Sequence, residues 1–414
     1  MTNDNNMKSY KHKGFLTALG GALALLVVMG IGRFAFTPLL PGMMVFHNFG
    51  DAVAGMMGSW NFAGYLAGVL LARKEKPGQR RYILFAVFLL LSLITTAGMG
   101  LAREIYLLHT IRFLAGFASG MCFVLISAIV LDTLSAVNRP ILTGLLYSGV
   151  GAGIVIGGLT AGPLEEIGSS PAGWLGMAAL CAPLVAVSIF ALHPSRNYAP
   201  FLPNTSAAAD TTAPHSGQDC GSPGRSEVNF LISQKNARIK YNLLLISYFL
   251  EGFSYIIGMT FIVALVQNVT ESPEIARASW IMTGISAAVS VPIWKFLSTR
   301  KGYLPMLILA FILQALGMLL PILSGSVIAA LSGGLLLGGT FMGITTLSLQ
   351  YGVLLSNKPS ANTVAVMTAL YGIGLTIGPI VAGGMGFYIA FVISALSMLA
   401  AAGILFAARL LQSH

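Results

Sequence analysis

The sequence predicts an all-α polytopic membrane protein with 12 transmembrane helices, arranged as two pseudo-repeated bundles of six. Of the 414 residues, 56% are hydrophobic and 9% are charged, whereas about 25% of the residues of a globular protein are charged. Long apolar segments such as 82–101 and 304–323 recur along the chain. Each is long enough for a helix that crosses ~30 Å of hydrocarbon, and neither alternates as a membrane β-strand does. The 48 glycines fit this prediction, because small residues let membrane helices approach closely.

Several of the expected helices begin with residues that suit a helix start. Ser170-Pro171 and Ser272-Pro273 place a capping hydroxyl before a proline, which is favoured in the first turn because it has no N–H group to satisfy. Most connections are short, which indicates that consecutive helices are antiparallel neighbours. We expect membrane spans at 14–40, 52–72, 82–101, 104–132, 140–163, 171–192, 241–267, 273–297, 304–323, 326–355, 360–384 and 386–410.

One connection, residues 193–240, is long and rich in Ala, Thr, Ser, Pro, Gly and Asp. Such a segment buries too little apolar surface to offset its ordering entropy. We expect a linker, with residues 227–240 as a short interfacial helix. The predicted domains are an N-terminal tail (1–13), an N-terminal six-helix bundle (14–192), the linker (193–240), a C-terminal six-helix bundle (241–410) and a C-terminal tail (411–414).

The net charge of +10 is distributed unevenly along the chain. Nineteen of the 23 Lys and Arg residues fall in alternate connections, which we place on one side of the membrane. Because such an excess marks the cytoplasmic side, we expect a multi-pass protein of the cell membrane with both termini in the cytoplasm. The same distribution argues against a nucleic-acid partner. The residues are Lys8, Lys11, Lys13, Arg73, Lys74, Lys76, Arg80, Arg81, Arg139, Arg196, Arg225, Lys235, Arg238, Lys240, Lys295, Arg300, Lys301, Lys358 and Arg409.

Little in the sequence favours an enzyme. Cys122, Cys181 and Cys220 are too scattered for a disulfide framework or a metal site. There is no His-Glu-x-x-His motif, no nucleophile elbow and no phosphate-binding Gly-rich loop. We therefore expect no catalytic residue, no metal and no cofactor, and we expect a monomer.

Glycine and proline patterns recur in the two halves. Gly149-Val-Gly-Ala-Gly153 in the fifth span is similar to Gly372-Ile-Gly374 in the eleventh, and a Gly-Pro pair follows each (Gly162-Pro163 and Gly378-Pro379). Glycines at this spacing allow close packing and rocking of helices, and prolines bend them. We assign these residues, with Gly158, a conformational role. A parallel repeat also places a substrate site near the midplane between the halves.

Two arginines lie within expected spans. A charged side chain in such a segment is costly and is a functional candidate by default. Arg33 is expected to bind an anion or to gate the cavity; the alternative is a structural arginine that bonds a neighbouring helix or extends outwards. Arg112 shares a helix face with His109, three residues earlier, and both are candidates for a proton path because histidine titrates near neutral pH.

Glu251 is the acidic residue that we place deep in a span. Ser247, Tyr248, Ser254 and Tyr255 lie at i−4, i−3, i+3 and i+4 and make a polar stripe that suits a protein interior. Desolvation and a nearby arginine would act on the proton affinity of this carboxyl in opposite directions, as a proton-coupling site requires. The alternative is a permanent salt bridge to one of the two arginines.

Other polar residues are secondary candidates. Asp132 closes the fourth span and, beside Arg73 and Arg139, is expected in a cytoplasmic gate. Gln350 is expected to donate or accept hydrogen bonds in the substrate cavity, together with Tyr248 and Tyr255, although bonding between helices would explain it equally well.

Three motifs resemble those of the major facilitator superfamily. The connection Gly68-Val-Leu-Leu-Ala-Arg73, which continues to Arg80-Arg81, keeps that family's glycines and basic run. The fourth span reads Arg112-Phe-Leu-Ala-Gly116-Phe-Ala-Ser-Gly120, and the resemblance implies that Arg112 faces the cavity and takes part in proton coupling. In the fifth span, Gly149, Gly158 and Gly162-Pro163 resemble the antiporter motif, although Glu165 and Glu166 follow in place of the usual glycines.

The sequence of the first span resembles a narrower group of proteins than the three motifs do. The segment Gly30-Ile-Gly-Arg-Phe-Ala-Phe-Thr-Pro-Leu-Leu-Pro41 resembles the YbfB/YjiJ subgroup of that superfamily, and so does the seventh-span segment 251–261. The resemblance implies twelve helices and alternating access. From it and the charges together we expect a proton-coupled secondary transporter of a small, anionic or zwitterionic organic solute, whose partners are that solute, protons and the lipid bilayer. The alternative is a proton-driven efflux antiporter for drugs or other toxic compounds.

Overall fold

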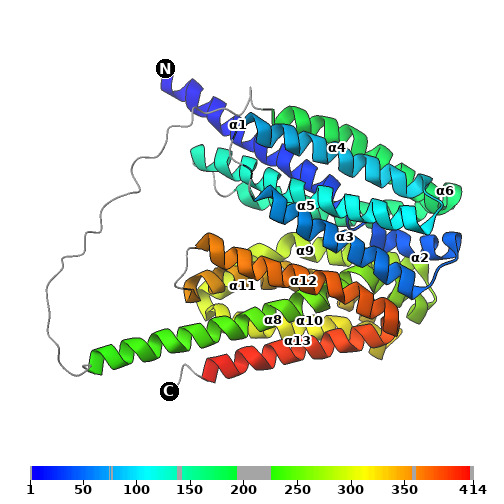
Figure 1. Cartoon of the computed structure of the whole chain (residues 1–414). Helices are drawn as coiled ribbons and strands as arrows, with labels where there is room; N and C mark the ends of the chain where they lie inside the picture. Colours follow the sequence, from blue (N-terminus) through cyan, green and yellow to red (C-terminus); the bar gives the residue numbers. More distant parts are fainter. Residues whose placement is uncertain are drawn as a thin grey trace.

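The computed structural model describes residues 2–73, 75, 78–137, 142–193, 225–356 and 360–410, and the described part is helical throughout its regular structure. The helices lie lengthwise beside one another in two groups, α1–α6 and α8–α13, which we call the N-terminal and C-terminal halves (Figure 1). The start of α1 and the end of α13 lie at one end of the molecule, which we call the terminal end; we call the other the opposite end.

The first span is broken, where the sequence predicts one continuous helix over 14–40. Helix α1 (Thr2–Leu25) passes into a π-helical segment η1 (Leu26–Ile31), and after a turn the chain resumes as α2 (Phe36–His47). In the turn, the N–H of Phe34 bonds the carbonyl of Met29 at 3.2 Å, five residues back. Pro38 has no N–H to bond the carbonyl of Phe34, so the regular ladder cannot run through this segment.

Helices α3 (Asp51–Ala72), α4 (Gln79–Leu101) and α5 (Ile105–Ala136) follow as predicted. Helix α6 (Thr143–Ala191) contains both the fifth and the sixth spans. Its backbone leaves the helical conformation at Gly168 and Ser169. The hydroxyl of Thr160 lies 3.4 Å from the sulfur of Met177, although 17 residues of straight helix would separate them by about 25 Å. The chain therefore doubles back at Gly168.

The C-terminal half consists of α8 (Arg225–Thr270), α9 (Pro273–Lys301), α10 (Tyr303–Leu323), α11 (Val327–Leu355), α12 (Ser360–Met385) and α13 (Phe387–Leu410). The hydroxyl of Ser272 accepts from the N–H of Ile275 at 3.3 Å, so the predicted cap before Pro273 is present. The separate interfacial helix expected at 227–240 is wrong: this segment is the first part of α8. Residues 194–224 of the expected linker lie outside the described residues.

Ten helices in the described part are long and apolar enough to cross a membrane. They include α6 as a single helix and leave out α3, which is less apolar because of its glycines and residues such as Asn61. Dividing α6 at its reversal and adding α3 accounts for the twelve predicted crossings.

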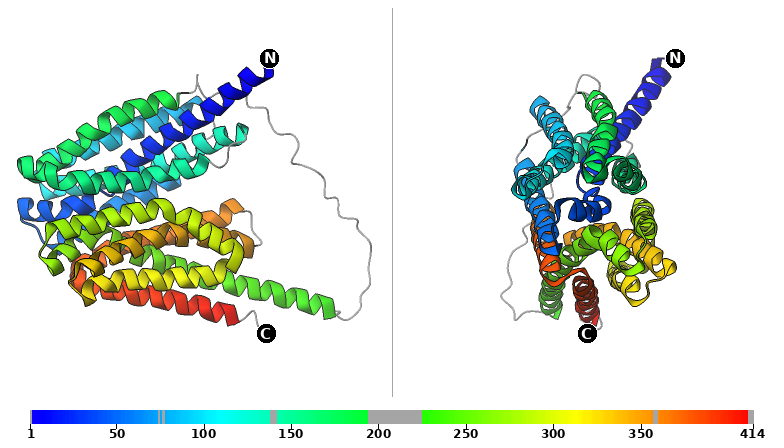
Figure 2. Two further views of the ribbon diagram at one scale, coloured as in Figure 1. Left: turned by 180° about the vertical axis from the view of Figure 1, so that it is seen from behind. Right: turned by 90° about the vertical axis from the view of Figure 1, so that its right-hand side faces the viewer.

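The two halves meet along three helix pairs: α3 with α12, α6 with α9 and α2 with α8 (Figure 2). Gly55 of α3 lies so close to Pro379 of α12 that a methyl group on it would overlap the carbonyl of Pro379. The Thr37 hydroxyl of α2 donates to the carbonyl of Met259 of α8 at 2.6 Å. Gly55, Pro379 and Thr37 all lie towards the opposite end.

Candidate functional site

Arg33 lies in the turn between η1 and α2, where the first span is broken. Its side chain is only 5% exposed. The guanidinium carbon is 4.3 Å from the centre of the Phe62 ring and 4.2 Å from that of Tyr65, both on α3. Because Arg33 lies in a turn, its side-chain direction is not fixed by a regular helix. The guanidinium extends between helices and not towards lipid.

Arg33 has few hydrogen-bond partners. One terminal nitrogen donates to the sulfur of Met29 at 3.8 Å, and the side chain bonds the hydroxyl of Tyr65. Its Nε is buried without a partner, and a buried donor left unsatisfied costs about 1–3 kcal/mol. Among the described residues no acidic group forms an ion pair with it.

Arg112 on α5 is even less exposed, at 2%, and its guanidinium carbon lies 4.2 Å from the centre of the Phe36 ring. Both its Nε and its Nη1 are buried without partners. The charge of Arg33 acts on it directly, so the two cations repel each other at close range. Asn61 of α3 donates to the backbone carbonyl of Arg112 at 2.9 Å, which holds this turn of α5 in place.

Glu251 is completely buried in α8. The side-chain amide of Gln314, on α10, donates to both carboxylate oxygens at 3.0 and 3.2 Å. The oxygen of that amide accepts from the hydroxyl of Thr340 of α11 at 3.0 Å. Glu251 therefore has its hydrogen bonds within the C-terminal half, and the described structure contains no salt bridge between it and Arg33 or Arg112.

The sequence analysis missed Gln314 as the partner of Glu251. A signal was present, because Gln314 is the one strongly polar side chain in the apolar segment 304–323. The four residues of the polar stripe expected around Glu251 contact different helices. The hydroxyls of Ser247 and Ser254 donate to the carbonyls of Ala401 and Ser394 of α13, whereas the two tyrosines lie on the other side.

The two tyrosines join a series of four rings from three helices, which we call the ring stack: Tyr248, Tyr371, Tyr255 and Phe341. Tyr248 stacks on Tyr371, and Tyr255 on Phe341, with ring centres 4.7 Å apart and planes 18° apart in both pairs. Tyr255 and Tyr371 are 6.2 Å apart at 21°. Leu66 of α3, next to the Tyr65 ring over which Arg33 lies, packs against Gly372, beside Tyr371, so the Tyr371 part of the ring stack lies near Arg33 across the interface of the halves.

Three other predicted site residues lie elsewhere. Gln350 accepts from the hydroxyl of Tyr303 at 3.2 Å near the terminal end, apart from the two arginines. His109 bonds the carbonyl of Ile105 one turn before it at 2.9 Å. Arg73 is exposed at the C-terminus of α3.

Asp132 was expected beside Arg73 and Arg139 in a cytoplasmic gate. Asp132 pairs with Arg81 at 2.8 Å and not with Arg73, while Arg139 lies outside the described residues. The sequence places several basic residues in the connection after α3, and only the folded position of α4 selects Arg81 among them.

The glycine and proline residues of the two motifs lie at helix contacts. Gly149 packs on α1, Gly158 on Trp280 and Ile281 of α9, and Gly378 on α8. Pro379 packs on Gly55 and Gly58 of α3. These residues therefore lie both within the halves and between them.

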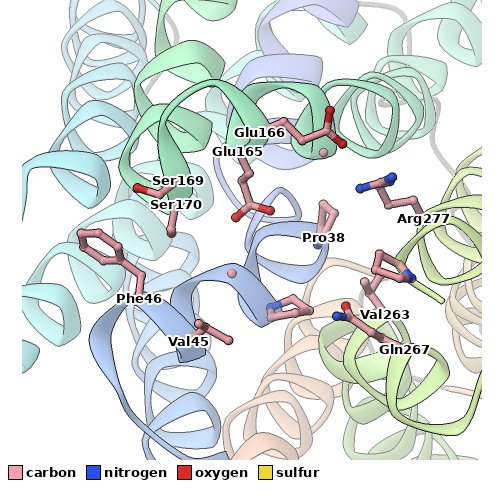
Figure 3. Close-up of a pocket in the computed structure, with 14 residues that line it drawn as sticks. Pro38, Val45, Phe46, Glu165, Glu166, Ser169, Ser170, Val263, Gln267 and Arg277 are labelled. Atoms are coloured by element: carbon pink, nitrogen blue, oxygen red, sulfur yellow. The ribbon is translucent and has the colours of Figure 1, made fainter. Parts of the chain in front are cut away.

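A cavity of about 440 Å³ lies between the halves at the opposite end (Figure 3). Glu165 of α6 and Arg277 of α9 project into it from the two halves. One carboxylate oxygen of Glu165 is buried without a partner, and Arg277 pairs with Glu274 of its own helix at 3.5 Å. Gly162, which precedes Pro163, leaves the space that the Arg277 guanidinium occupies. The sequence analysis noted Glu165 only as a departure from a motif.

Solved structures with the same architecture are transporters. The chain is similar to the nucleoside transporter NupG, with a TM-score of 0.66 and 16% identity over 95% of this chain and 98% of that one. A mutant of NupG gives a TM-score of 0.71 at 16% identity, covering 95% and 99%. A bacterial homologue of the human lysosomal transporter Spinster, in an inward-facing and unoccupied conformation, gives 0.62 at 17% identity, covering 96% of each chain. At these identities the likeness shows the fold alone.

Sequence comparison identifies the family. No curated protein matches the chain significantly. The profile of the family described as "Uncharacterised MFS-type transporter YbfB" matches residues 25–217 and 225–412, which include both halves. The chain therefore belongs to the YbfB family of the major facilitator superfamily and is a multi-pass membrane transporter, not an enzyme.

Proposed function

We propose that this transporter moves a small organic solute by alternating access and couples that movement to protons. One observation carries the proposal: the N-terminal half buries two arginines without acidic partners, and the C-terminal half buries one carboxyl completely. Charges inside a membrane-spanning structure are costly, and their usual justification is a substrate or ion pathway.

Alternating access requires one end to close while the other opens. The contacts that support a closed opposite end are those of α3 with α12 and of α2 with α8, where Gly55 meets Pro379 and Thr37 bonds Met259. We infer that these surfaces separate when the opposite end opens. The glycine–proline segments of α6 and α12 are then the surfaces on which the halves rock.

Glu251 is the proposed proton-coupling residue. A buried negative charge is costly, and a proton removes it. A protonated carboxyl also becomes a hydrogen-bond donor. If the amide of Gln314 turns to accept that proton, the hydroxyl of Thr340 keeps only its backbone acceptors, the carbonyls of Leu336 at 2.7 Å and Leu337 at 3.3 Å. Thr340 is adjacent to Phe341 of the ring stack, so a change of protonation would reach the surface that faces Arg33. We place Arg112 and His109 on the proton path in the N-terminal half.

The second candidate is an efflux antiporter for amphipathic cations. The packing of Gly158 and Gly162 of α6 against α9 favours it, because those glycines belong to the antiporter-like motif. The excess of buried positive charge at the interface disfavours it.

Purified protein in proteoliposomes with an imposed pH gradient separates these functions. We expect at least one anionic or zwitterionic metabolite to accumulate and to dissipate the gradient. Exchange of a lipophilic cation for protons would support efflux instead. If neither class moves protons above the rate in protein-free liposomes, proton coupling is rejected.

We propose a cell-membrane location with both termini in the cytoplasm, supported by the distribution of Lys and Arg. Cys122 and Cys181 are buried, so Cys220 offers a native label for the segment between the halves. We expect a membrane-impermeant maleimide to label Cys220 in broken cells but not in intact ones, with Cys220→Ser as the control. Labelling in intact cells would reverse the orientation.

A further inference from the structure

We propose that the central site binds a small aromatic monocarboxylate, in which a flat ring bears one carboxylate group. This inference rests on the proposed solute transport and names its substrate class. It follows from three features of the described residues: the excess of charge, the unused donors and the shape of the facing surface.

The charge excess favours an anion. Two guanidinium groups are buried in the N-terminal half and one carboxyl in the C-terminal half, which leaves an excess of one positive charge when Glu251 is ionised and of two when it is protonated. Glu251 does not compensate the arginines directly, because its oxygens are occupied by Gln314. One bound carboxylate restores neutrality in the ionised state. A cationic ligand would add to the repulsion that Arg33 and Arg112 already exert on each other.

The unused donors favour a carboxylate over other anions of the same charge. The Nε of Arg33 and the Nε and Nη1 of Arg112 are buried without partners. A guanidinium presents its N–H groups as a planar fork that matches the two oxygens of a carboxylate. We assign the carboxylate to Arg33, because its guanidinium carbon lies 4.2 Å from the centre of the Tyr65 ring, and Leu66, the next residue on α3, packs against Gly372, beside Tyr371 of the ring stack.

The facing surface favours a flat aromatic body. The ring stack presents Tyr248, Tyr371, Tyr255 and Phe341 with planes within 18–21° of each other. Tyr371 is partly exposed, whereas Tyr248, Tyr255 and Phe341 are only 2–4% exposed, so Tyr371 is the ring of the stack that a ligand can reach. Aromatic rings favour offset stacking on such a surface. Because Arg33 and the stack are neighbours, a short molecule with the carboxylate directly on the ring contacts both.

The test uses the full-length protein in detergent and four probes of similar size: benzoate, cyclohexanecarboxylate, benzamide and benzylamine. Binding is measured by calorimetry and by thermal stabilisation, since a ligand that binds only the folded state raises its stability. We expect benzoate to bind about tenfold or more tightly than cyclohexanecarboxylate, which lacks the flat ring, and benzamide, which lacks the charge. Benzylamine should not bind.

Two variants assign the contacts. Arg33→Lys keeps the charge but loses the fork, and should weaken benzoate binding about tenfold or more. Tyr255→Leu should also weaken it, because it removes the ring. The matched control is Arg300→Lys: Arg300 also lies 4.2 Å from a ring centre, that of Phe296, but on the exposed surface. Each variant is first shown to be monodisperse and cooperatively unfolding.

The outcomes separate this inference from the proposed function. The substrate class is overturned if benzamide or benzylamine binds as tightly as benzoate, or if Arg33→Lys and Tyr255→Leu leave benzoate binding unchanged. If benzoate does not bind but another solute moves with protons in proteoliposomes, the substrate class is overturned and the proposed proton-coupled transport stands. Benzoate binding with the expected variant pattern, but without gradient-driven uptake above protein-free liposomes, supports the site and rejects the coupling.

Discussion

The two halves bury opposite kinds of charged group. The N-terminal half supplies two buried arginines whose guanidinium groups lie on aromatic rings and retain unpartnered nitrogens. The C-terminal half supplies one buried carboxyl whose oxygens are bonded through Gln314 to Thr340. The guanidinium groups of the N-terminal half therefore lack hydrogen-bond partners that a ligand can supply. The carboxyl of the C-terminal half already has its partners within that half.

This difference assigns separate tasks to the halves. Unpartnered buried donors suit recognition of an anion, because a ligand removes their desolvation cost. A carboxyl with an internal network suits proton transfer, because a single proton reorganises bonds on three helices. Substitutions in each half test whether the N-terminal half recognises the anion and the C-terminal half transfers the proton.

Glu251→Gln should abolish accumulation driven by a pH gradient. With one proton per solute molecule, a gradient of one pH unit supports about tenfold accumulation, because about 1.4 kcal/mol corresponds to a factor of ten. The variant keeps the size of the side chain but carries no exchangeable carboxyl proton, so the concentration ratio should fall to one. Exchange of labelled for unlabelled solute at equal pH should persist. Glu271→Gln is the control. Normal accumulation in Glu251→Gln would reject the assignment of proton transfer to the C-terminal half.

Gln314→Leu should destabilise the protein more than Gln350→Leu. Loss of Gln314 leaves the Glu251 carboxyl without its two amide bonds, and hydrogen bonds to charged groups contribute about 1.5–3 kcal/mol. Gln350 accepts a single bond from Tyr303, and a polar bond between membrane helices contributes on average about 0.6 kcal/mol. Thermal unfolding in one detergent measures the difference. Equal losses in the two variants would show that the network does not satisfy Glu251.

Gly383→Ala should shift the conformational equilibrium towards an open opposite end. The added methyl group would overlap the backbone of Asp51 and Gly55 on α3, whereas the same change at Gly384 meets nothing within 4 Å. Overpacking costs about 1–3 kcal/mol. Spin labels at Val45 and Ile328, which are 84% and 78% exposed, report the separation of the halves. A matching distance distribution in Gly384→Ala would refute the steric explanation.

Asp132→Asn should have the smallest effect. It removes the ion pair with Arg81, but the Asp132 side chain is 66% exposed, and exposed ion pairs contribute at most about 1 kcal/mol. We expect a small change in the unfolding temperature and transport within twofold of normal. A large loss of transport with unchanged stability would assign this pair a gating role.

The sequence by itself determined the helical membrane class, the span positions and three central charges. Hydropathy is a property of each segment, and a charge within an apolar run is conspicuous whatever its neighbours are, so Arg33, Arg112 and Glu251 could be selected in advance. A reversal between residues 163 and 171 was also predicted, since the sequence divides that region into two spans, and the structure places it at Gly168 and Ser169.

The tertiary structure alone decided which groups meet. The partnership of Glu251 with Gln314, the pairing of Asp132 with Arg81 and the alignment of Tyr248 and Tyr255 with Tyr371 and Phe341 each join residues far apart in the chain. Local composition specifies what must be buried, because burial follows from the free energy of transfer of each side chain. Partners are selected only when helices pack, because hydrogen bonds and ring contacts depend on distances between segments that no local pattern contains.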